Sequence, residues 1–309
     1  MPNNFPQFEP HPHINSSIYE VALRLAAFDA NDKFYATGTS VAIAGNLLLA
    51  AKHVIDDFLK EFNCSYNEKA NITIWAVQIT NDKDLYAIWE CTEIFSWENS
   101  DIAILRIAPL NDIAAKRKAL TSCQLSFLPP KQGDNIVAFG YKGLSRDSCK
   151  ITRDGTGTKH FDIQDEPHVT TGKILDVYNN VKNPSRIPAP CFATEARVDG
   201  GMSGGPVFTE NGLLCGILST SFDVTDGELN TSFVSLLWPM LAIKLPLSKD
   251  RGSQTTEYSI QELVQKGLIS GTGWEHFIIN EKLGFISPPE EDNDQALAKY
   301  GWMTSTFIL

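Results

Sequence analysis

Ser203 lies in a glycine-dense segment that could present a nucleophile. The chain reads Asp-Gly-Gly-Met-Ser-Gly-Gly-Pro-Val-Phe from Asp199 to Phe208, so an apolar, strand-like segment follows the serine directly. A serine that attacks a carbonyl carbon needs backbone N–H groups aimed at the oxygen that becomes negative, and glycine lets the chain form that arrangement without clashes at Cβ. The segment predicts a nucleophile at Ser203, with the N–H groups of Gly201 and Ser203 as oxyanion donors.

Two further side chains that could assist this serine stand at the ends of apolar segments. His53 follows the run Leu-Leu-Leu-Ala-Ala-Lys, and Asp101 precedes the run Ile-Ala-Ile-Leu. A serine hydroxyl is a weak nucleophile at neutral pH, and an imidazole can take its proton as attack begins. Each residue also has a structural alternative, because a histidine at a strand end, an aspartate in a turn and a serine in a tight turn are all common.

The three segments resemble motifs of the trypsin-like, chymotrypsin-fold serine proteases. The segment ending at His53 is similar to the family's Thr-Ala-Ala-His, the one beginning at Asp101 to its Asp-Ile-Ala-Leu-Leu, and the one around Ser203 to its Gly-Asp-Ser-Gly-Gly-Pro. The order is also the family's, with separations of 48 and 102 positions. The resemblance covers residues 19–243 and points to a bacterial-type, intracellular member.

The resemblance implies a catalytic triad that needs no cofactor. His53 would act as general base, Asp101 would orient the imidazole by accepting a hydrogen bond from its other nitrogen, and Ser203 would form an acyl-enzyme. We therefore expect a serine endopeptidase with a protein or peptide substrate. The alternatives are a protease-fold module that binds peptides without turnover, or a protease that stays silent until a partner activates it.

The resemblance also places candidate substrate-binding residues. Arg197, six positions before the serine, would lie near the base of the S1 pocket and favour an acidic P1 side chain. Ser219, Thr220 and Ser221 would form the strand that pairs with the substrate backbone. Arg197 has a simpler alternative as a solvated loop charge.

Two departures from the family pattern concern activation and redox state. Met202 stands where secreted, zymogen-activated members carry an aspartate that pairs with a newly cut N-terminus, so activation by such a cut is not expected. Gly38 and Val54 stand where those members carry the disulfide that brackets the histidine. This agrees with a reducing compartment.

Composition excludes several classes of partner. The net charge of −11, from 26 basic and 37 acidic residues, argues against nucleic acid and membrane surfaces, because both need clustered Lys and Arg. The first 20 residues carry no Lys or Arg and no long apolar stretch, and the most apolar segment, 233–243, is shorter than the ~20 residues of a spanning helix. We expect a soluble, cytoplasmic protein.

The six cysteines are widely spaced, with no Cys-x-x-Cys pair. In a protein without an export signal, buried reduced thiols are favoured over disulfides. A zinc site is disfavoured because His11 and His13 lie in a proline-rich tail without a nearby cysteine pair. No metal site is predicted.

Short apolar segments separated by turn residues predict an all-β protein with two sets of strands. The first set comprises 21–28, 35–44, 47–51, 72–79, 85–91 and 102–107. The second comprises 124–127, 135–141, 170–177, 191–195, 205–208, 213–219 and 231–236. The resemblance implies that they form two six-stranded antiparallel β-barrels with the active site between them.

The strand pattern gives a domain division. We expect an N-terminal tail over 1–18, a first barrel over 19–108, a crossing over 109–122, a second barrel over 123–245 and a C-terminal extension over 246–309. Ser259 and Glu262 form a capping-box pattern that predicts a short helix in the extension, with Gly267 at its end. The extension is expected to pack on the second barrel. Blocking of the cleft, or docking of a regulatory protein partner through the last three residues, are the alternatives.

Overall fold

The structure of the protein is a computed structural model, which describes most of the chain. The described residues are 18–29, 34–63, 72–80, 86–97, 100–117, 119–142, 149–153, 159–163, 167–179, 189–222, 231–247, 255–280, 285–287 and 304–308. Apart from residue 18, the predicted N-terminal tail lies outside them. Within these ranges, no helix has the length and apolar character needed to cross a membrane.

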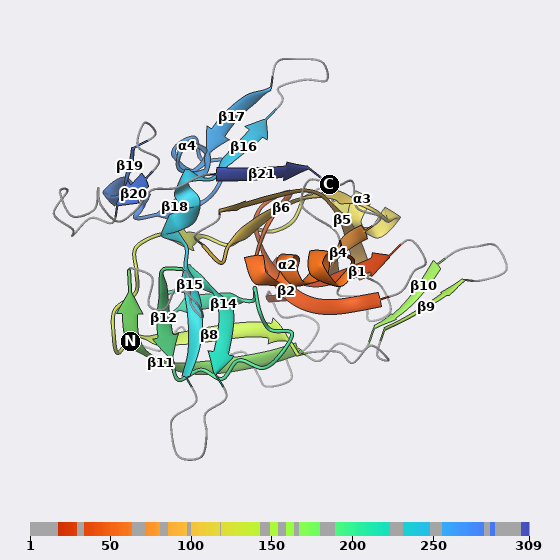
Figure 1. Ribbon diagram of the computed structural model, residues 1–309, viewed down its shortest axis with the longest axis horizontal. Helices are drawn as coiled ribbons and strands as arrows, with labels where there is room; N and C mark the ends of the chain where they lie inside the picture. The colour runs from red at the N-terminus through yellow and green to blue at the C-terminus, as the bar shows by residue number, and fades with distance from the viewer. Residues whose placement is uncertain are drawn as a thin grey trace.

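The first barrel is a closed ring of six antiparallel strands. These are β1 (Ala22–Asp29), β2 (Phe34–Ala44), β3 (Leu47–Ala50), β4 (Ile72–Ile79), β5 (Tyr86–Trp97) and β6 (Ala103–Pro109). They lie in the order β5-β4-β1-β2-β3-β6, and the pairing of β6 with β5 closes the ring. Figure 1 shows this barrel in red to yellow, across the middle of the view.

The second barrel is also a closed ring of six antiparallel strands. These are β8 (Asn135–Tyr141), β11 (Pro167–Tyr178), β12 (Cys191–Thr194), β13 (Pro206–Thr209), β14 (Leu214–Phe222) and β15 (Thr231–Leu236). They lie in the order β13-β8-β11-β12-β15-β14, closed by the pairing of β13 with β14, below the first barrel in Figure 1. The predicted pair of six-stranded barrels is confirmed.

Aromatic packing joins the two barrels. Tyr19, just before β1, meets Phe139 of β8 edge to face at 6.0 Å, and Phe139 meets Tyr141 in the same way at 5.2 Å. The Tyr141 hydroxyl donates to the carbonyl oxygen of Ala22 at 3.3 Å. Such aromatic pairs each contribute about 0.5–1.5 kcal/mol beyond the area they bury. The junction therefore fixes β8 against the first barrel.

One helix beside the first barrel was not expected from the sequence. α2 (Lys52–Glu61) begins directly after β3 and buries Val54, Ile55, Phe58 and Leu59. This spacing places four apolar side chains on one helical face, against the barrel. The other α-helices before the second barrel are α1 (Ile18–Val21) and α3 (Asp112–Arg117), the latter in the predicted crossing.

The predicted C-terminal helix is confirmed. α4 (Ile260–Gln265) begins with a capping box in which the Ser259 hydroxyl accepts from the Glu262 N–H and the Glu262 carboxylate accepts from the Ser259 N–H. Gly267, with φ of +70°, ends the helix in the left-handed region. The sequence therefore placed both helix ends.

The C-terminal extension contacts both barrels. β18 (Gly271–Thr272) pairs with β7 (Leu125–Ser126), which lies outside the second ring although the sequence predicted it as a barrel strand. The last strand, β21 (Thr304–Ile308), pairs instead with β5 of the first barrel, so the expectation of packing on the second barrel is wrong for this segment. The pairing of β5 with β4 covers residues 86–90, so the edge beyond is open to β21.

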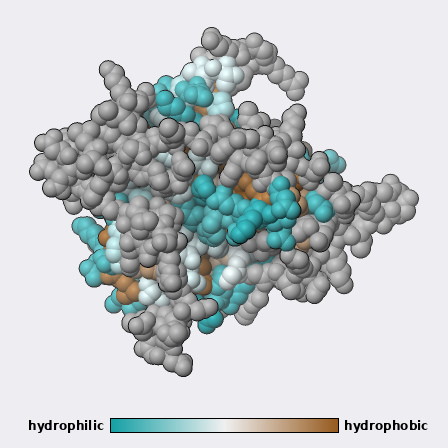
Figure 2. Space-filling model, in the orientation of Figure 1, coloured by the Kyte–Doolittle hydropathy of each residue, from teal (hydrophilic) through white to brown (hydrophobic). Residues whose placement is uncertain are grey.

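The remaining elements are short. They are β9 (Cys149–Arg153), β10 (Lys159–Ile163), η2 (Trp238–Ala242), β16 (Lys244–Leu247), β17 (Thr256–Ser259), η3 (Trp274–His276), β19 (Ile278–Asn280) and β20 (Phe285–Ser287). On the face drawn in Figure 2, hydrophilic residues cover much of the described surface, and hydrophobic residues form smaller groups.

The cysteines with described side chains are buried, as predicted, and no disulfide joins any two of them. They are Cys91, Cys123, Cys191 and Cys215. Burial raises the pKa of the Cys91, Cys123 and Cys215 thiols to about 12, so these thiols stay protonated and unreactive at neutral pH. Cys64 and the side chain of Cys149 lie outside the described residues.

Candidate active site

His53 and Asp101 are brought together by the pairing of β3 with β6. Ala50 at the end of β3 lies opposite Ala103 at the start of β6. His53 then stands in the first turn of α2, with its Nδ1 2.9 Å from Oδ2 and 3.0 Å from Oδ1 of Asp101. The backbone N–H of His53 also donates to Oδ1, at 2.9 Å. The carboxylate thus fixes both the backbone and the ring of the histidine.

The environment of His53 sets its pKa above the ordinary value. Burial of the ring lowers the pKa, but the hydrogen bond and charge of Asp101, with the charges of Asp57 and Asp56, outweigh it and raise the pKa above 6.5. The side chain keeps 40 % of its surface exposed. With Nδ1 held by the carboxylate, Nε2 is the nitrogen available for proton transfer.

Asp101 is also bound from the second barrel. Its side chain is 10 % exposed, and the Ser219 hydroxyl donates a hydrogen bond to its Oδ2. The sequence predicts Ser219 only as part of the substrate strand and does not predict this contact. The two residues are 118 positions apart, so no local pattern could reveal it.

The turn that carries Ser203 is built on glycines. Gly201 and Gly204 have φ of +88° and +84°, in the left-handed region. A Cβ on Gly204 would lie 2.1 Å from the carbonyl oxygen of Thr39, so only glycine fits against the first barrel here. The N–H of Gly204 donates to the carbonyl oxygen of Leu218 at 2.7 Å.

The two predicted oxyanion donors are unengaged. In the described part of the chain, the N–H groups of Gly201 and Ser203 have no hydrogen-bond acceptor. Their neighbours Met202, Gly204 and Gly205 all donate, to Asp199, Leu218 and Met202 respectively. A turn that satisfies the donors of Met202, Gly204 and Gly205 and leaves these two beside the hydroxyl open is suited to bind a negatively charged oxygen.

The Ser203 hydroxyl is directed at a backbone oxygen. It donates to the carbonyl oxygen of Ser219 at 3.0 Å. Among the described residues, it makes no hydrogen bond with His53. In this rotamer the hydroxyl proton of Ser203 points to the Ser219 carbonyl oxygen and not to the imidazole.

Gly38 and Val54 contact each other beside the histidine. A Cβ on Gly38 would lie 2.6 Å from Cγ1 of Val54, so the valine side chain fills the space next to the glycine. These are the two positions at which the resemblance places a disulfide in secreted members. In this chain the side chain of Val54 packs against Gly38 at these two positions.

Arg197 lies at the surface in an ion-pair network. Its side chain is 70 % exposed, and its Nε donates to Oδ1 of Asp199 at 2.9 Å, while Nζ of Lys142 lies 2.9 Å from Oδ2. Burial raises the pKa of Asp199, but Lys142 and Arg197 outweigh it and lower the pKa below its ordinary value. The predicted role of Arg197 in the S1 pocket stays a prediction.

The predicted substrate strand has an open edge. β14 pairs with β15 through residues 216–222, but its pairing with β13 ends at Ile217. Within the described residues, no strand pairs with Ser219, Thr220 and Ser221 on the β13 side. The Ser221 hydroxyl donates to the carbonyl oxygen of Val198 at 3.0 Å, which joins this strand to the segment before Ser203. An extended peptide could add to this edge.

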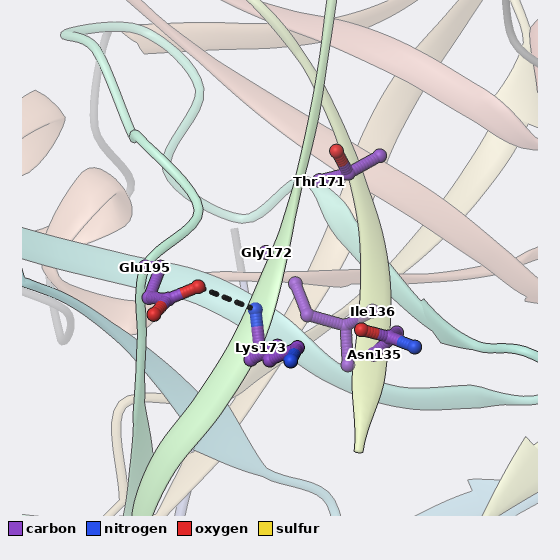
Figure 3. A pocket seen from close by; sticks show the side chains of 6 residues that line it. All are labelled: Asn135, Ile136, Thr171, Gly172, Lys173 and Glu195. Carbon is purple, nitrogen blue, oxygen red and sulfur yellow. Dashed lines mark hydrogen bonds between the residues drawn. The ribbon is translucent and has the colours of Figure 1, made fainter. Parts of the chain in front are cut away.

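A separate hollow lies on the second barrel, away from these residues. Its volume is about 470 Å³, and it is lined by Asn135, Ile136, Thr171, Gly172, Lys173 and Glu195. Figure 3 shows the Glu195 carboxylate accepting a hydrogen bond from the Lys173 N–H, at 3.4 Å. No predicted site residue lines it.

Comparisons relate the chain to one protein family and to several solved structures. The family described as trypsin-like peptidase domain matches residues 36–217. Among solved structures, the chain is similar to Deg5 at 15% identity and a TM-score of 0.47, over 72% of this chain and 88% of that one. It is also similar to the active form of the Rv3671c protease from M. tuberculosis, at 19% identity and a TM-score of 0.43, over 76% and 86% of the two chains. The search of curated proteins found no match.

Proposed function

The chain belongs to the trypsin-like peptidase family, and from this premise we propose that it is a serine endopeptidase with Ser203 as nucleophile. The observation that carries the proposal is the pair of open N–H groups, on Gly201 and Ser203, beside the hydroxyl. Each donor of this kind is worth about 10²–10³ in kcat where it has been removed from other enzymes. The His53–Asp101 pair supports the same function.

The proposed acylation step uses all three side chains. The oxygen of Ser203 forms a bond to the carbonyl carbon of the substrate while its proton passes to Nε2 of His53. The electrons of the C=O bond move to the oxygen, which the two open N–H groups bind. Asp101 stabilises the imidazolium through Nδ1. The C–N bond then breaks, and the proton on Nε2 goes to the departing amine.

Deacylation reverses these roles with water. His53 takes a proton from the water, whose oxygen bonds to the acyl carbon, and the ester bond to Ser203 breaks. The proton returns from Nε2 to the serine oxygen. The products are a carboxylic acid and the regenerated hydroxyl, so the sequence needs no cofactor.

The open edge of β14 supports a peptide as substrate. Ser219 to Ser221 offer backbone groups to an extended chain, which would bring a peptide bond next to Ser203. Arg197, at the predicted S1 position, favours an acidic P1 residue. The buried free thiols and the Gly38–Val54 contact support action in a reducing compartment such as the cytoplasm.

One observation favours a second candidate, a protease that is silent at rest. The Ser203 hydroxyl is engaged by the Ser219 carbonyl oxygen rather than by His53. Breaking such a hydrogen bond costs about 0.5–1.5 kcal/mol net, which substrate binding or a partner at the C-terminal extension can offset. This cost alone would make the free protein turn over peptides about 2- to 10-fold more slowly than the activated protein.

A fluorophosphonate probe tests the proposed nucleophile. We expect covalent labelling on the tryptic peptide that contains Ser203, lost in Ser203→Ala and strongly slowed in His53→Ala. Cleavage of an internally quenched peptide with both ends blocked then distinguishes an endopeptidase from an exopeptidase. Unlabelled wild-type protein that still binds peptides would show a binding module.

A further inference from the structure

The turn from Asp199 to Gly205, called the nucleophile turn below because it carries Ser203, depends on the first barrel for its shape. Gly200 and Gly201 stand together, and a Cβ on Gly200 would meet no atom within 4 Å. Two consecutive glycines populate many backbone conformations, so an open N–H between them keeps one direction only if neighbouring atoms hold the peptide. The N–H of Gly201 itself has no acceptor in the described chain. Its direction must be set through the rest of the turn.

Thr39 supplies the contacts that hold this turn. Its hydroxyl donates to the carbonyl oxygen of Gly201 at 3.0 Å, and its backbone N–H donates to the carbonyl oxygen of Ser203 at 2.8 Å. Its own carbonyl oxygen packs against Gly204, where a Cβ would lie only 2.1 Å away. One residue of the first barrel thus contacts three of the four residues from Gly201 to Gly204.

The Thr39 hydroxyl is itself held in place. It accepts the backbone N–H of Tyr141 at 3.0 Å, so the hydroxyl proton is directed to the carbonyl oxygen of Gly201. Thr39 has no exposed surface. Its N–H is available to Ser203 because the pairing of β2 with β3 begins only at Ser40, opposite Ala50. The buried hydroxyl of Thr39 thus donates one hydrogen bond and accepts another, both with backbone groups of the second barrel.

We propose that Thr39 is a positioning residue for the oxyanion hole: its hydroxyl holds the carbonyl oxygen of Gly201, and this restricts the rotations at Gly201 that set the direction of its open N–H group. The inference rests on the proposed function. It also gives this chain a way to hold the turn with Met202 at the position where the resemblance places an aspartate. The side chain of Met202 is fully buried, and its sulfur accepts the N–H of Asp199 at 3.4 Å.

The kinetic test uses two near-isosteric variants. Thr39→Val keeps the shape and removes the hydroxyl, and we expect kcat to fall by about 10-fold or more with KM changed less than about twofold, since a misplaced catalytic group costs rate rather than binding. Thr39→Ser keeps the hydroxyl and should stay within about threefold of wild type. The inhibition constant of a peptide aldehyde, whose adduct carries an oxyanion, should rise in parallel with the loss of kcat for Thr39→Val.

Thr194 provides a matched control. It has no exposed surface, its hydroxyl donates to the carbonyl oxygen of Lys173 at 3.0 Å, and it accepts the N–H of Ala196 at 3.1 Å. Thr194→Val therefore removes a buried hydroxyl that also donates one hydrogen bond and accepts another, neither of them with the residues from Gly201 to Gly204. We expect a comparable loss of stability with kcat retained. Equal losses of kcat in Thr39→Val and Thr194→Val would overturn the proposal.

Amide hydrogen exchange separates this proposal from the proposed function. The peptide spanning 199–205 should exchange faster in Thr39→Val than in wild type, whether or not the protein turns over substrate. Wild-type labelling by the fluorophosphonate with unchanged kcat and exchange in Thr39→Val would overturn the role of Thr39 alone. If wild type does not label, the proposed function fails, and the exchange comparison by itself supports or overturns the positioning role.

Discussion

The Ser219 hydroxyl donates a hydrogen bond to Oδ2 of Asp101, from the second barrel to the first. The same carboxylate holds the ring and the backbone N–H of His53. The orientation of the imidazole is therefore set by groups from both barrels. His53 and Asp101, which the sequence predicts as partners, both belong to the first barrel.

Removing this hydroxyl should weaken catalysis without unfolding the protein. In Ser219→Ala, Asp101 loses a donor to its charged form, a bond worth about 1.5–3 kcal/mol when one partner is charged. We expect kcat to fall by about 10-fold in a peptide-hydrolysis assay, because the imidazole is less firmly held. Ser126→Ala is the control, since among the described residues the hydroxyl of this half-buried serine bonds only the carbonyl oxygen of Leu128, at 3.4 Å. Equal activity of Ser219→Ala and wild type would contradict the prediction.

The pH dependence of activity should follow His53. Its raised pKa means that the imidazole stays protonated, and unable to accept a proton, to a pH above its ordinary 6.5. We expect kcat/KM to rise with pH through a midpoint above 6.5. In Asp57→Asn the midpoint should move to lower pH with the plateau unchanged, because the Asp57 charge helps to raise this pKa. Asp176→Asn, on the second barrel, should leave the midpoint in place.

The backbone of the nucleophile turn gives a stability prediction with an internal control. Gly204 and Gly212 both have positive φ, at +84° and +76°, but only Gly204 is crowded. Gly212→Ala should cost about 1 kcal/mol of unfolding free energy, the penalty of the left-handed conformation alone. Gly204→Ala should cost well over about 2 kcal/mol, because its Cβ would overlap the carbonyl oxygen of Thr39. Denaturant unfolding of the two variants measures both values.

Strand positions could be predicted where a short, mostly apolar run is bounded by turn residues. The predicted segments 72–79, 135–141 and 231–236 coincide with β4, β8 and β15. β5 was predicted to end at residue 91 but continues to Trp97, because a bulge between Cys91 and Glu93 interrupts the alternation. Helices α4 and α2 differ in whether the sequence marks their first residue. α4 has a capping box that can be read in the sequence, whereas Ala51, which precedes α2, makes no side-chain cap.

The candidate site was predictable only in its local parts. His53, Asp101 and Ser203 each lie in a recognisable segment, and the glycines around the serine mark its turn. The contacts of Ser219 with Asp101 and of Thr39 with Gly201 join segments that are 118 and 162 positions apart. Serine and threonine are frequent in strands, so nothing in their own neighbourhoods distinguishes these two from others. Only the packing of one barrel on the other brings them to the site.

The P1 preference tests the assignment of Arg197. Peptides that differ only at P1, with Asp, Glu, Leu, Phe, Lys or Arg, should show the highest kcat/KM for the two acids, because a guanidinium pairs well with a carboxylate. In Arg197→Met the preference for acids should shrink by about 10-fold, while the rate for Leu stays within about threefold. Asp199 and Lys142 complete the network, since Asp199 partly neutralises the Arg197 charge. Lys142→Met is the matched control, because it removes the other cation that pairs with the Asp199 carboxylate. This variant should keep the preference for acidic P1 residues. Equal rates across the panel, or a preference for Lys and Arg, would remove Arg197 from the S1 pocket and leave it as a surface partner of Asp199.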